Sequence, residues 1–305
     1  MKAIQVLNAK TGARLVEVPM VKRGGEGSEV LVKTLFAPIH PSDLQVEDRR
    51  YPWTLGLEGS GVIVEAKNKE LIGKRCAFYK YNGTFTEYVV PTNYFLVPDD
   101  LSSEDASLMN INPVSALALH KLTSGQRFIL SGANSNLGQL LLNLSKNQKP
   151  ICIVRNQEGR QKLMLQGVSH VIDYTRGSFF EYLNLCIKDY PVSIGFDLVA
   201  GKMTSTLLGL LENGGVLYQV GHLSNKPIES VDYKEFIHRN KYLKGFNFLN
   251  YEGKIGEFYK EILNEPFMFR SNIVKTVNFE DYGQAFIDYK RNMRAGKILL
   301  KFNHN

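Results

Sequence analysis

Apolar and polar side chains alternate over short segments in the first third of the chain. The segments with this period of two, which is typical of strands with one buried face, are 29–35, 61–66, 76–79, 85–90 and 94–98. Gly, Pro, Asn and Asp lie between them, as in turns. We therefore predict an all-β, barrel-like domain. A helix starting at 101–106 follows it, and a second helix at 114–121 follows a break at Asn112-Pro113.

Strand and helix patterns alternate through the middle of the chain. The apolar runs expected to be buried strands are 127–131, 150–154, 169–172, 194–199, 215–220 and 242–248. Because helical patterns lie between most of them, this order predicts an α/β fold with a doubly wound parallel sheet. Short strand patterns return near the end, with a helix at 279–291 and a last strand at 296–302. We expect a domain of residues 115–264, inserted into a β domain of residues 1–114 and 265–305.

Residues 127–146 read as a strand, a tight turn of small residues and a helix. The turn runs from Gly132 to Gly138, and the apolar residues after it have helix spacing: Leu137, Leu140, Leu141 and Leu144. Such a unit offers backbone N–H groups and a partial positive charge to a pyrophosphate. The usual third glycine is replaced by Ser135, whose hydroxyl can donate to phosphate. The segment therefore predicts a dinucleotide site, although any α/β protein can contain an ordinary turn of this kind.

Composition limits the other function classes. The chain has 305 residues, 44% hydrophobic and 22% charged, with a net charge of +7 from scattered basic residues, which does not favour nucleic-acid binding. No apolar run approaches the roughly 18 residues of a membrane helix, and no targeting segment is visible at the start. The three cysteines have neither metal-ligand nor disulfide spacing, so we expect a reducing compartment.

Several short motifs in order resemble the medium-chain dehydrogenase/reductase superfamily. They are His40-Pro41-Ser42-Asp43-Leu44, residues 56–62, Asn112-Pro113-Val114-Ser115-Ala116, the 132–138 turn, residues 196–201, Gly214-Gly215 with Gly221, and Gly296-Lys297. The resemblance covers essentially the whole chain. It implies a Rossmann dinucleotide-binding domain at 115–264, inserted into a GroES-like β-barrel substrate and catalytic domain at 1–114 and 265–305.

The sequence is similar to the zinc-free branch of that superfamily. Leu57 precedes Glu58 where the zinc enzymes have a histidine, and no thiols are nearby. The branch contains quinone oxidoreductases and 2-enoyl thioester reductases. Residues 134–138 and 241–249 are similar to the enoyl reductases of mitochondrial fatty-acid synthesis. This implies a location in the mitochondrial matrix, with the cytoplasm as the alternative, and a homodimer paired through strand 242–248.

The residue at the end of the second Rossmann strand indicates which cofactor is bound. An acid there accepts from the ribose 2′-hydroxyl of NAD, whereas a guanidinium binds the 2′-phosphate of NADP. Strand 150–154 runs into Arg155, with Arg160 and Lys162 close behind and no acid at the position. We therefore predict NADPH, with Arg155 as the main contact. The alternative is a solvated surface arginine.

The resemblance implies conjugate reduction of an activated C=C bond in an enoyl thioester, or reduction of a quinone. Tyr51 matches the position of the proton-donating tyrosine of the enoyl reductases, although it can equally be a packed aromatic before Pro52. Lys241 and Phe246–Phe248 are candidates to face the substrate, and His222 is expected on the surface. The predicted cofactor-binding residues are His40, Ser115, Ser131, Gly132, Asn134, Ser135, Asn136, Leu137, Gly138, Arg155, Arg160, Gly221, Phe246, Phe248 and Lys297.

Three features depart from the family pattern. Asn136 replaces a glycine in the phosphate turn, His40 replaces an asparagine, and the loop 45–50 is unusually charged for an acyl entrance. A second hypothesis is therefore a non-catalytic family member that serves as a structural subunit of a larger assembly.

Overall fold

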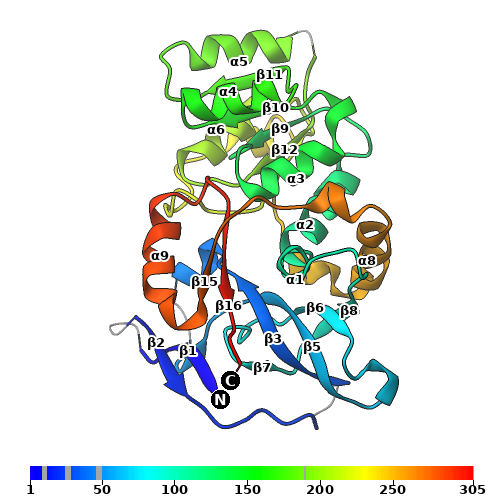
Figure 1. The fold of residues 1–305 in the computed structure, drawn as a ribbon. Helices are drawn as coiled ribbons and strands as arrows, with labels where there is room; N and C mark the ends of the chain where they lie inside the picture. Colours follow the sequence, from blue (N-terminus) through cyan, green and yellow to red (C-terminus); the bar gives the residue numbers. More distant parts are fainter. Residues whose placement is uncertain (9–11, 25–28, 46–49, 189, 305) are drawn as a thin grey trace. The chain divides into compact units, whose positions relative to one another are not determined.

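The computed structural model describes residues 1–8, 12–24, 29–45, 50–188 and 190–304 (Figure 1). The chain divides into two compact units. Unit 1 comprises Met1–Val114 and Glu257–Asn305, and unit 2 comprises Ser115–Gly256. Unit 1 is therefore built from both ends of the chain, and unit 2 from its middle.

Unit 1 is built mainly from two sheets. The larger has the order β15-β16-β3-β5-β6-β8, with β7 also paired to β3. Its strands are β3 (Val30–Pro38), β5 (Glu58–Ala66), β6 (Arg75–Tyr79), β7 (Tyr88–Val89), β8 (Asn93–Leu96), β15 (Ile273–Asn278) and β16 (Lys297–Lys301). The smaller sheet has the order β2-β1-β4, from β1 (Lys2–Val6), β2 (Ala13–Glu17) and β4 (Trp53–Thr54). Because β16 pairs antiparallel with β3, the C-terminal segment completes the N-terminal sheet.

An apolar cluster, here the barrel cluster, fills unit 1 between the small sheet and helix α9 (Tyr282–Arg291). Its buried members are Ile4, Val6, Ala37, Ile39, Leu55, Phe85, Phe279, Ala285, Tyr289, Ile298, Leu300 and Phe302. Strand β1 contributes Ile4 and Val6, and the intervening Gln5 faces away, as the period of two requires. The other helices and turns of unit 1 are η1 (Pro41–Leu44), η2 (Lys69–Leu71), α1 (Ser103–Ala106), η5 (Pro266–Phe269) and η6 (Phe279–Asp281).

Unit 2 is a parallel sheet with the order β11-β10-β9-β12-β13-β14. The strands are β9 (Phe128–Ser131), β10 (Ile151–Val154), β11 (His170–Asp173), β12 (Ile194–Asp197), β13 (Val216–Gln219) and β14 (Tyr242–Gly245). Its helices are α3 (Asn136–Leu144), α4 (Gln157–Leu165), α5 (Phe179–Lys188), α6 (Lys202–Leu210) and α7 (Lys234–Ile237), with short η3 (Lys146–Gln148) and η4 (Phe248–Lys254). One face of the sheet packs against α3 and α4, and the other against α5 and α6. Helices α2 (Ile111–Leu122) and α8 (Ile255–Asn264) contain the points where the chain passes between the units.

The predicted fold class, a doubly wound parallel Rossmann sheet inserted into a GroES-like barrel, is confirmed. Three local predictions were wrong. Helix α2 begins at Ile111 and runs through Pro113, because proline is tolerated in the first turn of a helix. The strand predicted at 242–248 ends at Gly245, because the Asn247 side chain caps the turn that follows by accepting from Leu249 N. Within 85–90, only Tyr88–Val89 forms a regular strand.

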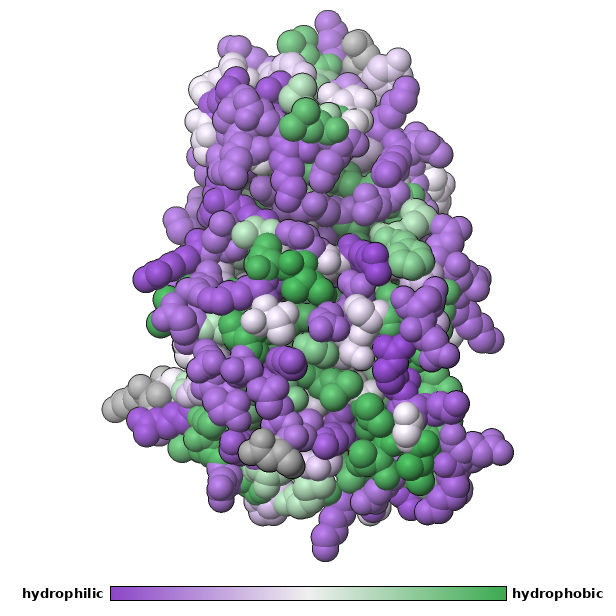
Figure 2. Space-filling model, in the orientation of Figure 1, coloured by the Kyte–Doolittle hydropathy of each residue, from purple (hydrophilic) through white to green (hydrophobic). Residues whose placement is uncertain are grey.

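The surface is mainly polar on the face that Figure 2 shows, with apolar side chains in separate small groups. No helix in the described parts of the chain is both long and apolar enough to cross a bilayer.

Candidate functional site

The turn between β9 and α3 has the geometry of an anion cradle. Gly132 has φ +62°, a conformation that favours glycine. A Cβ at Gly138 would lie 2.6 Å from the carbonyl oxygen of Ala133, so only glycine allows the helix to approach the turn this closely. The Ser135 hydroxyl caps α3 by accepting from Gly138 N at 3.1 Å. The helix N-terminus thus presents its partial positive charge at the end of a buried strand, a position that suits a pyrophosphate.

The cradle lies at the point where the strand order of unit 2 reverses. Strand β9 has β10 on one side and β12 on the other, so the chain winds in opposite directions from it. In open α/β sheets, ligands bind outside the carboxyl ends of the strands at this point. The carboxyl ends of β9 and β12 are Ser131 and Asp197. Fold and turn therefore indicate the same place for a dinucleotide.

A buried polar cluster joins those two strand ends. The Ser131 hydroxyl donates to Asp197 Oδ1 at 2.6 Å and accepts from Leu198 N at 2.9 Å. Asp197 also accepts from Val199 N at 2.8 Å, Ala200 N at 3.2 Å and the Thr204 hydroxyl at 2.7 Å. The Ser131 hydroxyl is thus used to hold β9 against β12. A bond from it to a phosphate would replace one of these contacts.

Arg155 is an exposed cation directly after β10. It makes no hydrogen bond or ion pair with any residue that the structure describes. The neighbouring Asn156 caps α4 by accepting from Gly159 N at 2.9 Å. Arg160, by contrast, donates from Nε to Val171 O at 3.1 Å, which ties α4 to β11. Of the two predicted phosphate-binding arginines, Arg155 therefore has its whole guanidinium available.

The remaining predicted residues of unit 2 have varied surroundings. A Cβ at Gly221 would lie 3.0 Å from Leu198 O, and one at Gly159 would lie 2.6 Å from the Asn134 amide nitrogen, so both glycines allow close packing. Phe246 packs against the apolar cluster beneath α3, 5.4 Å from the ring of Tyr251. Four more lie on helices and turns: Ser115 is buried in α2, Asn136 and Leu137 open α3, and Phe248 opens η4.

Lys241 does not face a substrate, and that prediction was wrong. Its ammonium is buried and donates to Leu208 O at 2.8 Å and Gly209 O at 3.1 Å, the carbonyls near the end of α6. Glu235 completes the site with an ion pair at 2.7 Å. Lys241 therefore stabilises a helix end.

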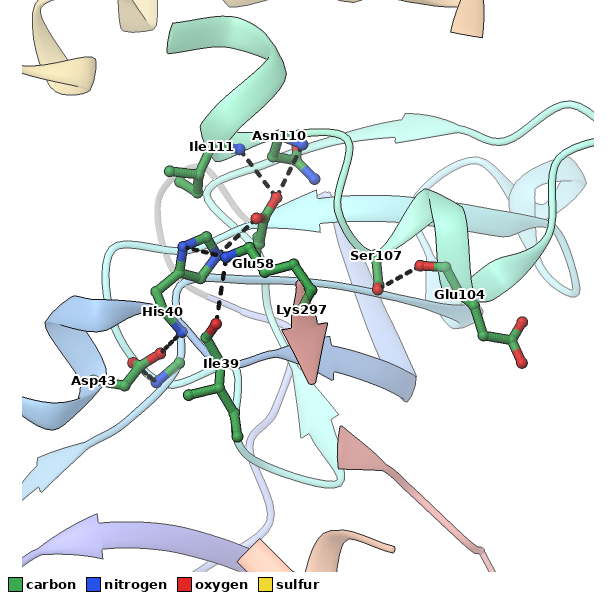
Figure 3. A network of polar contacts seen from close by, with 10 residues as sticks. Ile39, His40, Asp43, Glu58, Glu104, Ser107, Asn110, Ile111 and Lys297 are labelled. Atoms are coloured by element: carbon green, nitrogen blue, oxygen red, sulfur yellow. Dashed lines mark hydrogen bonds and ion pairs between the residues drawn. The ribbon is translucent and has the colours of Figure 1, made fainter. Parts of the chain in front are cut away.

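Unit 1 contains a chain of buried polar groups, shown in Figure 3. Glu58 Oε1 lies 2.8 Å from His40 Nε2, and Glu58 Oε2 accepts from Asn110 N at 2.9 Å and Ile111 N at 3.0 Å. On the other side of the ring, Lys297 Nζ lies 3.2 Å from His40 Nδ1. We call Glu58, His40 and Lys297 the Glu–His–Lys network. Their exposed fractions are 0%, 4% and 2%.

The hydrogen bonds of this network assign its protons. An ammonium can only donate, so Nδ1 of His40 accepts from Lys297 and Nε2–H donates to Glu58. Burial lowers the pKa of Lys297 to about 8, although the Glu58 and Asp43 carboxylates oppose the shift. Both ring nitrogens of His40 are therefore used within unit 1. A direct hydrogen bond from His40 to a nicotinamide would require one of these contacts to break.

Asp43 holds the loop that carries His40. Its carboxylate accepts from His40 N at 2.8 Å and from Gly56 N at 3.0 Å. Burial raises the pKa of Asp43, and the two backbone bonds and the charge of the Lys297 ammonium oppose that shift. Tyr51 is half-buried against the barrel cluster. Of the charged loop predicted at 45–50, residues 46–49 lie outside the described residues.

Comparisons with known proteins agree with this architecture. No model of a protein family matches the chain. The chain is 26% identical over 309 residues to the mitochondrial enoyl-[acyl-carrier-protein] reductase of Dictyostelium discoideum, which covers 89% of this chain and 86% of that protein. A putative NADPH:quinone reductase from Mesorhizobium loti is similar in structure, with a TM-score of 0.85, 23% identity and coverage of 99% and 98%. The Escherichia coli quinone oxidoreductase complexed with NADPH also has a TM-score of 0.85, with 17% identity and coverage of 99% and 100%.

The chain belongs to the zinc-free medium-chain dehydrogenase/reductase superfamily. The side chains of unit 1 are consistent with a zinc-free member, since both Glu58 oxygens are occupied by protein donors. Within the described ranges, no three His, Cys, Asp or Glu side chains are grouped so that they could hold a metal ion.

Two carboxylates of this superfamily member were not predicted as site residues. Asp197 and Glu58 are both fully buried and both bind several donors. The available signal was an acid at an end of an apolar strand, where charge is costly unless it is paired. Their partners Ser131 and Asn110 come from distant parts of the sequence and could not be read from it.

Proposed function

We propose that this protein is an NADPH-dependent reductase of an activated C=C bond, with a 2-enoyl thioester as substrate. The observation that carries the proposal is the β9–α3 cradle together with Arg155 at the end of β10, whose guanidinium has no partner among the described residues. The substrate class is supported by relatives named as enoyl-[acyl-carrier-protein] reductases. Their description as mitochondrial supports the mitochondrial matrix as the location.

Each residue group has a separate role in this proposal. The first backbone amides of α3 bind the pyrophosphate, and the Arg155 guanidinium binds the 2′-phosphate. NADPH, when bound, supplies the hydride for the β-carbon. Tyr51 donates a proton to the α-carbon, because a phenol hydroxyl is a suitable donor to a developing enolate. The Glu–His–Lys network positions the 39–44 loop that precedes Tyr51.

Turnover distinguishes this function from its two rivals. Purified protein is mixed with NADPH and either crotonyl-thioester, hexenoyl-thioester or a quinone, and NADPH oxidation is followed. NADPH oxidation with the thioesters supports the proposal. NADPH oxidation with the quinone alone would show that the protein is instead an NADPH:quinone reductase. Nucleotide binding without turnover on any substrate favours the non-catalytic subunit. The predicted homodimer through β14, an edge strand of the sheet, also stays a proposal.

Arg155→Asp is expected to weaken NADPH binding by about 10- to 100-fold, because a hydrogen bond to a charged group contributes about 1.5–3 kcal/mol. NADH, which lacks the 2′-phosphate, should bind with nearly unchanged affinity. Titration calorimetry with both nucleotides measures the preference. Arg14→Asp, the same charge reversal at an exposed position of β2, is the control. An unchanged ratio of the two affinities would show that Arg155 does not read the phosphate.

Tyr51→Phe is expected to lower kcat with crotonyl-thioester by about 100-fold or more, since a general acid contributes roughly 10²–10⁴. NADPH affinity should not change, because the phenol does not contact the cofactor in this proposal. Tyr190→Phe, which removes an exposed hydroxyl, is the matched control. A kcat within about twofold of the parent would assign Tyr51 to packing alone.

A further inference from the structure

A cavity of about 270 Å³ lies in unit 1 on the small sheet, on the side away from the barrel cluster. The alternation of the strands shows this. Ile4 and Leu55 belong to the barrel cluster, whereas their neighbours Gln5 and Thr54 line the cavity. One wall is apolar, from Val18, Pro19 and Val21. No lining residue belongs to the cradle or to the Glu–His–Lys network, so the cavity shares no residue with either.

Lys80 lines this cavity, and its cation has no counter-ion among the residues that the structure describes. It follows β6 directly and is only partly exposed. Burial lowers the pKa of Lys80, and no acidic group opposes the shift. Its ammonium makes no hydrogen bond or ion pair with any described residue, and none of the lining residues is acidic. A partly buried charge of this kind is costly unless something pairs with it.

Thr54 supplies a second donor beside Lys80. Gln5 Nε2 donates to the Thr54 oxygen at 2.9 Å, so the hydroxyl hydrogen remains to be donated to another group. Gly83 lies between the two side chains: a Cβ built on it would be 3.8 Å from Thr54 Cβ and 3.9 Å from Lys80 Cε. The Thr54 methyl group also lies 3.9 Å from that Cβ, so the two side chains are neighbours, and both line the cavity. The ammonium and the hydroxyl both donate, and the cavity therefore favours an acceptor with negative charge.

We propose that this cavity binds a small oxyanion, a phosphate or a carboxylate, through the Lys80 ammonium and the Thr54 hydroxyl. The volume is just below the roughly 300–1,000 Å³ of ordinary small-molecule pockets, which favours a compact ligand. The apolar wall leaves room for a short carbon chain on a carboxylate. The site is independent of the proposed reductase function, since it uses none of the same residues.

Titration calorimetry on the full chain tests the site with two probes, inorganic phosphate and propionate. We expect one of them to bind. Lys80→Met, which keeps the stem and removes the charge, should weaken that binding by about tenfold or more, and Thr54→Val should weaken it by a smaller factor. Lys74→Met removes an exposed charge just before β6 and should have no effect. Thermal unfolding of Lys80→Met should show no loss of stability, because the variant removes a partly desolvated charge.

The two probes separate the sources of the anion. Binding of phosphate alone assigns a phosphate ligand, and binding of propionate alone assigns a carboxylate. If neither probe binds, or if binding is the same in Lys80→Met and the parent, the proposal is overturned.

Discussion

Replacing Glu58 by glutamine is expected to lower the free energy of unfolding by about 3–5 kcal/mol, the usual cost of breaking a buried charged pair. No orientation of the new amide satisfies the site. If its NH₂ group faces Asn110 N and Ile111 N, two buried backbone donors lose their acceptor. If it faces His40, two donors meet, and the ring cannot change tautomer because the Lys297 ammonium occupies its other side.

Urea denaturation measures this loss. Glu65→Gln is the control, because Glu65 lies on the same strand and is exposed. The double variant Glu58→Gln/Lys297→Met should lose less than the sum of its single variants, because it removes both buried charges together. A loss below about 1 kcal/mol in Glu58→Gln, or strict additivity in the double variant, would show that the network is not coupled as described.

The fold was predictable because the spacing of apolar residues along the chain follows which side chains are buried. Strand β10 is buried throughout and reads as a continuous apolar run, as expected for a parallel sheet with both faces covered. Strand β1 alternates, with Ile4 and Val6 in the barrel cluster. Periodicity does not predict the end of a strand where a side-chain cap determines it. The apolar pattern continues past Gly245, but Asn247 starts a new turn there.

The candidate site was only partly predictable. Gly132 and Gly138 allow the cradle to be predicted from the sequence. Gly132 has a positive φ, and a Cβ at Gly138 would clash with the backbone of Ala133, so both positions require glycine. The partners of His40 are 18 and 257 positions away in the sequence, at Glu58 and Lys297. The contact with Lys297 forms only once the C-terminal strand β16 joins β3. The sequence motifs therefore identify the residues but not the hydrogen bonds that they make.

Asp197→Ala is expected to lose at least about 3 kcal/mol of unfolding free energy, whereas Asp197→Asn should lose about 1 kcal/mol. Alanine leaves the N–H groups of Val199 and Ala200 and the Ser131 hydroxyl without their acceptor in a fully buried place. Asparagine keeps an oxygen at Oδ1, and its NH₂ group can donate to Thr204, whose hydroxyl then donates to Gln219 Oε1 at 2.9 Å. The difference in unfolding free energy between the two variants thus separates the contribution of the hydrogen bonds from that of the negative charge.

Denaturation of both Asp197 variants, alongside NADPH titration, completes this test. Because the carboxylate holds the ends of β9 and β12 together at the reversal of the sheet, its bonds also shape the cradle. We expect the asparagine variant to keep its nucleotide affinity within about threefold and the alanine variant to lose about tenfold or more. Equal losses of stability in the two variants would mean that the negative charge itself, rather than the set of hydrogen bonds, stabilises this edge of the sheet.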